Sequence, residues 1–236
     1  MNRRTLALCI DAPMQSWGQR SRGVLRDTAL EPTKSGIVGL LAAATGVARH
    51  DEERIAELAA LRLGVRVDRE GLLERDYHTT QNVPTTSGSG HRTVVSERYY
   101  LADALFLVLL EGPPDLLARL AEAVTSPRWP LFFGRRAFVP ARPLFKTLAE
   151  QSLDDLIRGH KWLEHPDRAQ SAARDQQRPG LRTVIDCPPD DPRAEPRHDV
   201  PYSFADGDRR YGPRTVAVDE VPLTDMMIPS EETRCS

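Results

Sequence analysis

Residues 104–110 read Ala-Leu-Phe-Leu-Val-Leu-Leu, an unbroken apolar run of the length of one β-strand. A run this short, bounded by turn signals, is typical of a buried strand. Pro113-Pro114 follow it and open a predicted helix at residues 115–124. That helix places four apolar side chains along its inner side, Leu116, Leu117, Leu120 and Val124. Together the two segments predict a strand and a helix that pack in the core of an α+β fold.

The N-terminal part of the chain predicts a second strand and helix. Residues 5–11 (TLALCID) form the expected strand, and residues 14–31 the expected polar loop. Pro32-Thr33-Lys34-Ser35 then precede a run of small and apolar residues, which predicts a helix capped by Ser35 and ended by Thr45-Gly46. A short helix at 51–61 and a strand at 63–67 complete this part.

Residues 76–91 are polar, with Gly88 and Gly90 set among serines and threonines, and predict the flexible tip of a long hairpin. Residues 129–139, interrupted by Gly134-Arg135-Arg136, are the predicted last strand. Apart from the hairpin, the order strand, helix, strand, strand pair, helix, strand is that of the ferredoxin-like fold, an antiparallel sheet with two helices on one face. RNA-recognition modules use the same arrangement and bind RNA on the open face of the sheet or on its loops.

The C-terminal part predicts a smaller unit. Residues 153–163 form an amphipathic helix, and the proline-rich and charged residues 186–201 predict a mobile loop. Short strands are expected at 183–185 and 215–218. We therefore expect an N-terminal domain at residues 1–148 and a small β-rich C-terminal domain at residues 149–236.

Composition limits the class of protein. The 236 residues are 40% hydrophobic and 28% charged, which is typical of a globular protein. No apolar run approaches the roughly 18 residues of a membrane span, so no membrane association is expected. The three cysteines are widely spaced, which suggests a reducing cytoplasm. Residues 1–50 carry seven Lys+Arg and three Asp+Glu, so a polyanionic partner is expected on the N-terminal part.

Lys34-Ser35 raises the question of a phosphate site. A Walker loop is excluded, because Thr28 and Thr33 stand where its pattern needs glycine. A lysine and free N–H groups at a helix N-terminus still suit a phosphate. The alternative is a capped helix with a solvated lysine.

Asp76-Tyr77-His78-Thr79 offers a tyrosine beside a histidine. A metal-free ribonuclease could use them as general acid and base on a ribose 2′-hydroxyl. The alternative is that they stack on, or hydrogen-bond to, a partner. The histidines and cysteines lack zinc-site spacing, so we expect no metal. No cofactor is expected either.

Met14-Gln15-Ser16-Trp17-Gly18 directly follows the first strand. A tryptophan in a polar loop needs either a core pocket or a flat partner, and the arginines after it, Arg26 among them, make a base or a phosphate plausible. Arg26, Lys34, Arg98 and Arg135 come from four segments that this fold can bring together.

Taken in order, these motifs resemble the CasD family, the RAMP-fold subunit that binds the crRNA 5′ handle in type I-E CRISPR Cascade complexes. The resemblance rests on five stretches, residues 14–18, 32–41, 76–79, 93–104 and 133–136. It implies a non-catalytic, cytoplasmic subunit that holds the handle and caps the protein–crRNA filament in antiviral defence. It also implies a β-hairpin thumb at about residues 76–100.

Expected partners by this resemblance are the crRNA 5′ handle, the Cascade backbone subunit, the large subunit and, in the assembled complex, target DNA. The expected RNA-binding residues are Met14, Gln15, Ser16, Trp17, Gly18, Arg26, Lys34, Ser35, Gly36, Tyr77, His78, Arg98, Tyr99, Gly134, Arg135 and Arg136. In the related type I-C systems the family member is itself the nuclease. A metal-independent endoribonuclease that processes CRISPR repeat RNA, with Tyr77, His78 and Lys34 as its catalytic set, is therefore the alternative.

Overall fold

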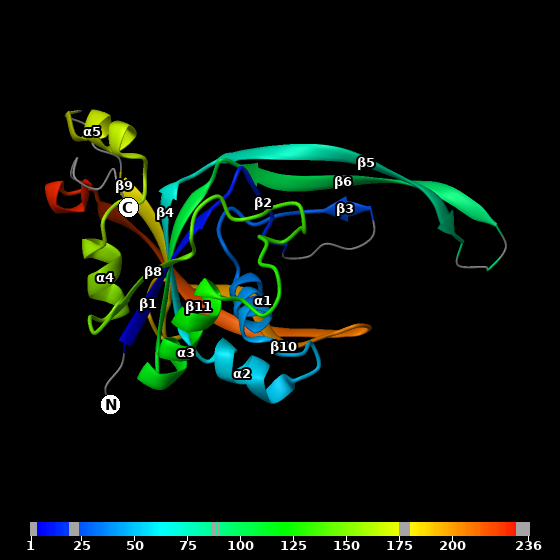
Figure 1. The fold of residues 1–236 in the computed structure, drawn as a ribbon, viewed down its shortest axis with the longest axis horizontal. Coiled ribbons are helices and arrows are strands. Elements are labelled where there is room, and N and C mark those ends of the chain that lie inside the picture. The colour runs from blue at the N-terminus through cyan, green and yellow to red at the C-terminus, as the bar shows by residue number, and fades with distance from the viewer. Residues whose placement is uncertain (1–3, 19–23, 86–87, 89, 175–179, 230–236) are drawn as a thin grey trace.

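The computed structural model describes residues 4–18, 24–85, 88, 90–174 and 180–229. Within these residues the chain is a mixed α/β fold built on a seven-stranded antiparallel sheet with the strand order β10-β11-β9-β4-β7-β1-β8 (Figure 1). Its strands are β1 (Arg4–Asp11), β4 (Arg62–Arg69), β7 (Leu105–Gly112), β8 (Phe145–Ala149), β9 (Gly180–Asp186), β10 (Ala194–Ala205) and β11 (Asp208–Pro222).

The predicted apolar run at 104–110 forms β7, near the middle of this sheet. Phe106, Val108 and Leu110 point to one face and join the main core. The leucines between them point to the other face and join a second cluster. Because neighbouring residues of a strand alternate between faces, a run that is apolar throughout requires cover on both sides.

Three helices cover the first face and one covers the second. α1 (Lys34–Thr45), α2 (Glu52–Ala59) and α3 (Pro114–Thr125) contribute to the main core, whereas α4 (Leu153–Gly159) packs on the opposite side. α1 is capped by Thr33, whose Oγ1 accepts a hydrogen bond from the N–H of Gly36 at 3.2 Å, so the predicted cap at Ser35 is wrong by two residues. None of the described helices is long and apolar enough to cross a membrane.

α4 occupies the sheet face that RNA-recognition modules leave open. It lays Leu153, Leu156 and Ile157 on β4 and β7, and a side chain on Gly64 of β4 would meet Leu153 at 2.7 Å. Of the two places where RNA-recognition modules bind RNA, the sheet face and its loops, the sheet face is therefore covered over β4 and β7.

When β2, β3, α2 and the β5–β6 hairpin are set aside, β1, α1, β4, β7, α3 and β8 follow in the order strand, helix, strand, strand, helix, strand. The predicted last strand at 129–139 is wrong, because these residues form an irregular loop and β8 pairs with β1 instead. Gly134 has φ +91°, and the N–H of Phe138 donates to the carbonyl of Arg135 in a turn that excludes a strand ladder.

The strands after residue 149 extend the same sheet, since β9 pairs with β4 and β11 with β9. The mobile loop predicted at 186–201 is wrong from residue 194 onward, where β10 begins. β10 accommodates Pro196 and Pro201 because it is an edge strand with two register irregularities. α5 (Pro166–Arg174) and a short 3-10 helix (Asp225–Met227) enclose a third small core around Trp162.

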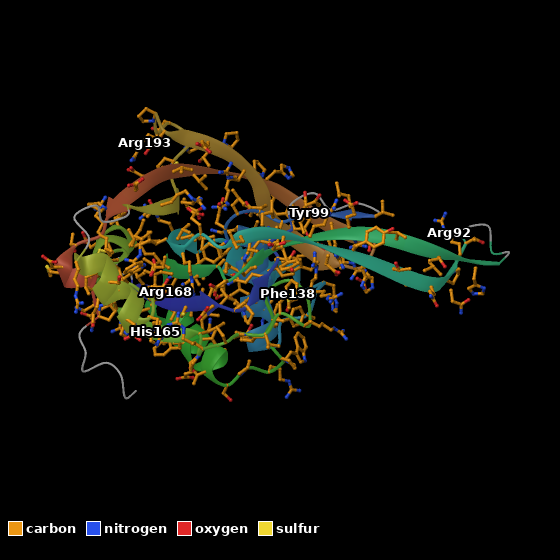
Figure 2. All side chains as sticks on the ribbon, turned by 90° about the horizontal axis from the view of Figure 1, so that it is seen from above. Arg92, Tyr99, Phe138, His165, Arg168 and Arg193 are labelled. Atoms are coloured by element: carbon orange, nitrogen blue, oxygen red, sulfur yellow. The ribbon has the colours of Figure 1, made fainter. Side chains whose placement is uncertain are left out.

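A second sheet carries the predicted hairpin. β5 (Leu72–Pro84) and β6 (His91–Ala102) pair along their length, and β6 also pairs with β2 (Met14–Gln15) and β3 (Leu25–Arg26). The ribbon projects far from the body of the molecule (Figure 1). Arg92 lies toward its far end and Tyr99 where it meets the body (Figure 2). Positions 86, 87 and 89 of the expected thumb lie outside the described residues.

One ion pair fixes α4 to the sheet. Arg66 and Asp68 of β4 are fully buried with 2.6 Å between Arg66 Nε and Asp68 Oδ1. Arg66 also donates to three backbone carbonyls at the end of α4 and just after it, those of Ile157, His160 and Lys161. The carboxylate of Asp68 accepts from the N–H of Leu163 at 2.8 Å.

Arg66→Met is expected to lower the free energy of unfolding by about 3–5 kcal/mol, because it removes the cation that pairs with the buried Asp68 carboxylate and the donor that three carbonyls share. Urea unfolding of the full chain measures this. The control is Arg75→Met, which removes an exposed ion pair with Glu97 on the hairpin and should cost less than about 1 kcal/mol. Equal losses in the two variants would contradict the structural role of Arg66.

Candidate nucleic-acid interface

Three arginines from separate segments meet where the hairpin joins the body. Arg26 of β3 is the register partner of Arg98 of β6. Arg135, from the loop before β8, donates from Nη2 to the carbonyl oxygen of Tyr99 at 2.7 Å and lies over the Phe138 ring at 5.2 Å. We call Arg26, Arg98 and Arg135 the arginine cluster.

The guanidinium groups of the cluster are close enough for Arg98 and Arg26 to act on Arg135. Partial burial lowers the pKa of Arg135, and the neighbouring Arg98 and Arg26 guanidinium groups lower it further. Asp76, opposite Arg98 in the hairpin register, acts in the other direction. Because guanidinium groups stay charged, three of them held together favour an anion beside them. Arginine is well suited to a phosphate, which it can bind through two parallel N–H groups.

Gly134 sets how the loop carrying Arg135 lies against the rest of the site. Its φ of +91° is in the left-handed region, and a Cβ there would lie 2.0 Å from the carbonyl oxygen of Ser16. The N–H of Ser16 in turn donates to the carbonyl of Phe133 at 3.0 Å. This close approach directs the half-buried Arg135 to the cluster, whereas the next residue, Arg136, is exposed and lines a groove on α1.

The motif at 14–18 is mainly part of the core. Gln15 is fully buried and donates from Nε2 to the carbonyl of Ala104 at 2.8 Å. Trp17 is only 2% exposed, donates from Nε1 to Gln15 and packs on Phe133 with ring centroids 5.8 Å apart. This burial favours the core interpretation of Trp17 over base stacking. Met14 and Gly18 are the exposed residues of the motif, and Ser16 is buried with its hydroxyl directed to the carbonyl of Tyr99.

Lys34 does not join the arginine cluster. Its side chain is buried, and Nζ donates to Asp186 Oδ2 at 2.7 Å and to the carbonyl of Leu61. Burial lowers the pKa of Lys34, and Asp186 opposes that effect. Its backbone N–H donates to Asp199 Oδ2 at 2.8 Å, so carboxylates of the chain itself fill the place expected for a phosphate. Both sequence interpretations of Lys34, as a phosphate ligand and as a solvated lysine, are therefore wrong.

Tyr77 and His78 lie on β5 of the hairpin. Tyr77 is 66% exposed and His78 half-buried, and as consecutive residues of a strand they point to opposite faces of the ribbon. Lys34, the third member of the alternative catalytic set, is held inside the body by Asp186. The structure does not bring these three groups together around one reacting phosphate.

A groove of about 770 Å³ lies beside the cluster, and no sequence motif predicted it. Seven of the predicted site residues line it: Ser16, Trp17, Gly18, Ser35, Gly36, Gly134 and Arg136. Its other charged or aromatic lining residues were missed because they come from the connection after α1, the irregular loop and the C-terminal hairpin: Arg49, Trp129, Phe132, Phe204, Arg209 and Tyr211. Among the described residues, no three His, Cys, Asp or Glu side chains form a group that could hold a metal ion.

Comparison with known proteins identifies the family. The family model described as CRISPR-associated protein (Cas_Cas5) matches residues 5–217. The chain belongs to this family. The match covers all of the central sheet up to β11 together with the hairpin, and therefore includes the arginine cluster and the groove.

Individual relatives agree with this assignment. The Escherichia coli (strain K12) protein named CRISPR system Cascade subunit CasD is 35% identical over 165 residues, which cover 64% of this chain and 73% of that protein. A solved structure titled CRISPR RNA-guided surveillance complex contains a chain that is 30% identical, with a TM-score of 0.76 over 96% of this chain and 93% of its own. Another, titled Crystal structure of Cas protein, is 36% identical, with a TM-score of 0.69 over 92% and 95%. The resemblance to the CasD family inferred from the motifs is confirmed.

Gly134→Ala is expected to destabilise the fold by about 1–3 kcal/mol and to displace the loop, because it adds both backbone strain and a clash with Ser16. Gly207→Ala is the matched control, since φ there is +81° but nothing lies within 4 Å of the added Cβ. Urea unfolding of both variants separates the clash from the strain. A loss in Gly134→Ala no larger than that in Gly207→Ala would contradict the close approach of the loop.

Proposed function

We propose that this chain is the crRNA-binding, non-catalytic subunit of a type I-E CRISPR Cascade surveillance complex in the cytoplasm. It holds the crRNA 5′ handle and caps the backbone filament in antiviral defence. The single observation that carries this proposal is the arginine cluster at the hairpin base, in a chain whose relative is named as a Cascade subunit. Within it, β1 to β8 form a ferredoxin-like RAMP unit, and the β5–β6 hairpin is the thumb.

The position of the cluster supports an RNA backbone at this place. α4 closes the sheet face that RNA-recognition modules use, which leaves the loops and the hairpin base as the accessible part of the fold. The cluster draws on β3, β6 and the loop before β8, so a strand of RNA lying there contacts three segments at once. Phosphate contacts of this kind fix the position of a nucleic acid without reading its sequence.

The hairpin supports contact with protein neighbours. Leu72 and Leu73 at the start of β5, and Tyr77 farther along it, are 68%, 55% and 66% exposed. We assign these side chains to contacts with the backbone subunit. The large subunit and, in the assembled complex, target DNA are the further partners of the proposal.

The nuclease alternative has less support. Tyr77 and His78 point to opposite faces of the ribbon, and the Lys34 ammonium is paired inside the body. A general base and a general acid must both reach one 2′-hydroxyl and its phosphate. We therefore propose that the chain binds RNA without cutting it.

Removing one arginine of the cluster is expected to flatten the salt dependence of RNA binding. Arg26→Gln and Arg135→Gln should each reduce the slope of log affinity against log salt by about 0.7, the value for one contact to a single-stranded phosphate. Fluorescence anisotropy with single-stranded CRISPR repeat RNA, on the chain assembled with its partner subunits, measures the slope. Arg119→Gln, which removes an exposed cation on α3, is the control and should leave it unchanged. Wild-type slopes in both cluster variants would refute the proposed RNA path.

Incubation of the full chain with repeat RNA, in EDTA and in magnesium, is expected to yield no cleavage product. Attack by a 2′-hydroxyl needs no metal and leaves a 2′,3′-cyclic phosphate, so this end group is the diagnostic readout. RNA incubated without protein is the control. A cyclic phosphate that appears with the wild-type chain and disappears in Tyr77→Phe or His78→Ala would establish the nuclease instead.

A further inference from the structure

The long hairpin continues two strands of the central sheet. β4 leads into β5 and β6 leads into β7, and both connections are interrupted at the same level, by residues 70–71 on one side and 103–104 on the other. The ribbon turns away from the sheet at this break (Figure 1). We infer that the break is a fixed elbow, and that Arg182 of β9 is the positioning residue that holds the hairpin at one angle. The elbow is a property of the free chain, so it does not depend on the proposed function.

Both sides of the break pass through left-handed backbone. Gly71 has φ +71° and Asp103 has φ +58°. A Cβ on Gly71 would lie 2.7 Å from the Cβ of Ala104 and 2.8 Å from the carbonyl oxygen of Ala102, so the two sides approach this closely only with glycine there. Aspartate is among the few residues with a side chain that adopt the left-handed region readily. The residue types at the break therefore suit a sharp turn of both strands.

The segment after β1 pairs with backbone groups that the break removes from the strand ladder. The N–H of Asp103 donates to the carbonyl of Pro13 at 3.0 Å. The buried Gln15 donates from Nε2 to the carbonyl of Ala104 at 2.8 Å. Buried backbone groups need such partners, and straightening the ribbon would break both hydrogen bonds.

Ion pairs tie the Asp103 side of the elbow to the body. Arg69, the last residue of β4, donates from Nη1 to Asp103 Oδ2 at 3.1 Å. Its other guanidinium nitrogens lie 3.9 Å from Asp11 Oδ1 and 3.5 Å from Glu164 Oε2. Asp11 ends β1 and Glu164 precedes α5, so a single guanidinium connects the elbow with both the sheet and the C-terminal part.

Arg182 ties the other side of the elbow to β9. Its Nε and Nη2 donate to the two carboxylate oxygens of Glu70, each at 2.9 Å, and its Nη1 donates to Glu31 Oε2 at 2.9 Å. Exposed ion pairs contribute little in general, but a bidentate arginine–carboxylate pair fixes the orientation of its partner as well as the distance. Glu70 directly precedes Gly71, so this pair acts on the turn itself from 112 positions farther along the chain.

These contacts distinguish a fixed elbow from a hinge. A hinge residue absorbs a large change of φ and ψ, which requires that the change costs few contacts. Rotation at Gly71 is opposed by the close approach of Ala104 and by the pair of Glu70 with Arg182. Rotation at Asp103 would break a backbone hydrogen bond and an ion pair. A hairpin held in one direction is already oriented when a partner arrives, which lowers the ordering cost of binding.

Distances between two spin labels on the free, full chain test the elbow. One label is placed by Thr79→Cys, at an exposed residue of β5 before the register irregularity that begins at Thr80. The other is placed by Arg119→Cys, at an exposed residue of α3. Cys187→Ser and Cys235→Ser remove the other cysteines apart from the buried Cys9. Pulsed electron double resonance is expected to give one narrow distance distribution for this labelled parent chain.

Arg182→Met and Glu70→Ala are each expected to broaden this distribution and to shift its mean. Because both remove the same bidentate pair, the double variant should give the distribution of Arg182→Met. The matched control is Arg193→Met, which removes another bidentate pair, with Asp191, and a further carboxylate contact away from the elbow. It should leave the distribution unchanged.

The melting temperature of each variant shows that the fold is retained. A broad distribution in the labelled parent would mean that the break is a hinge, and the elbow would be refuted. It would also be refuted if either Arg182→Met or Glu70→Ala kept the parent distribution, or if Arg193→Met changed the distribution as much as they do. No RNA or partner subunit enters this measurement, so its result leaves the salt-dependence test of the proposed function unaffected.

Discussion

The ion cluster of Lys34, Asp186, Asp199 and Arg214 joins the helix α1 to the C-terminal strands β9, β10 and β11. Asp186 accepts from Lys34 Nζ at 2.7 Å, Arg214 Nε donates to Asp199 at 2.6 Å, and Arg214 also bonds Asp186. The backbone N–H of Leu63 donates to the same Asp186 carboxylate at 2.9 Å, which brings β4 into the cluster. Buried charges are tolerated only when each has its partner, so α1, β4, β9, β10 and β11 have to meet in this one register. The α1 wall and the C-terminal wall of the groove are positioned by the same constraint.

The arginines of this molecule have two kinds of surroundings. Some are bound by a carboxylate of the chain, and Arg135 is not, in the part of the chain that the structure describes. Arg66 and Arg214 are buried, and each is bound by carboxylates in a bidentate or shared arrangement that satisfies its donors. Arg135 instead has the carbonyl of Tyr99 and the ring of Phe138, and forms no ion pair within the described residues. Its neighbours Arg98 and Arg26 add positive charge instead of cancelling it. Interior arginines of this chain hold the fold together, and those at the hairpin base are the contacts of the proposed RNA path.

The cover of α4 on the second face of the sheet explains why the proposed RNA interface lies at loops. Once α4 has taken the second face, the sheet can offer only its edges and the connections between strands. The hairpin, the segment at 14–18 and the Gly134 loop leave the sheet on one side and pack on one another through Ser16, Phe133 and Tyr99. Loops carried on a rigid core can hold a ligand precisely while tolerating variation in sequence. This arrangement is consistent with a family whose members share a fold over nearly the whole chain at about a third sequence identity.

The sequence alone determined the family and some of the local elements. The run at 104–110 and the helix after Pro113 depend on residues close together in the chain. The spacing of apolar residues predicts such elements directly, and the order of the motifs can be read from the sequence in the same way. The burial of Lys34 and Trp17 depends on contacts between distant parts of the chain, which periodicity does not show. Lys34 meets Asp186 across 152 positions, and Trp17 packs on Phe133, so only the tertiary structure could show that both are interior groups. The same holds for β10, whose prolines resemble those of a loop until the edge of a sheet provides a place for them, and for the groove, whose walls come from three distant segments.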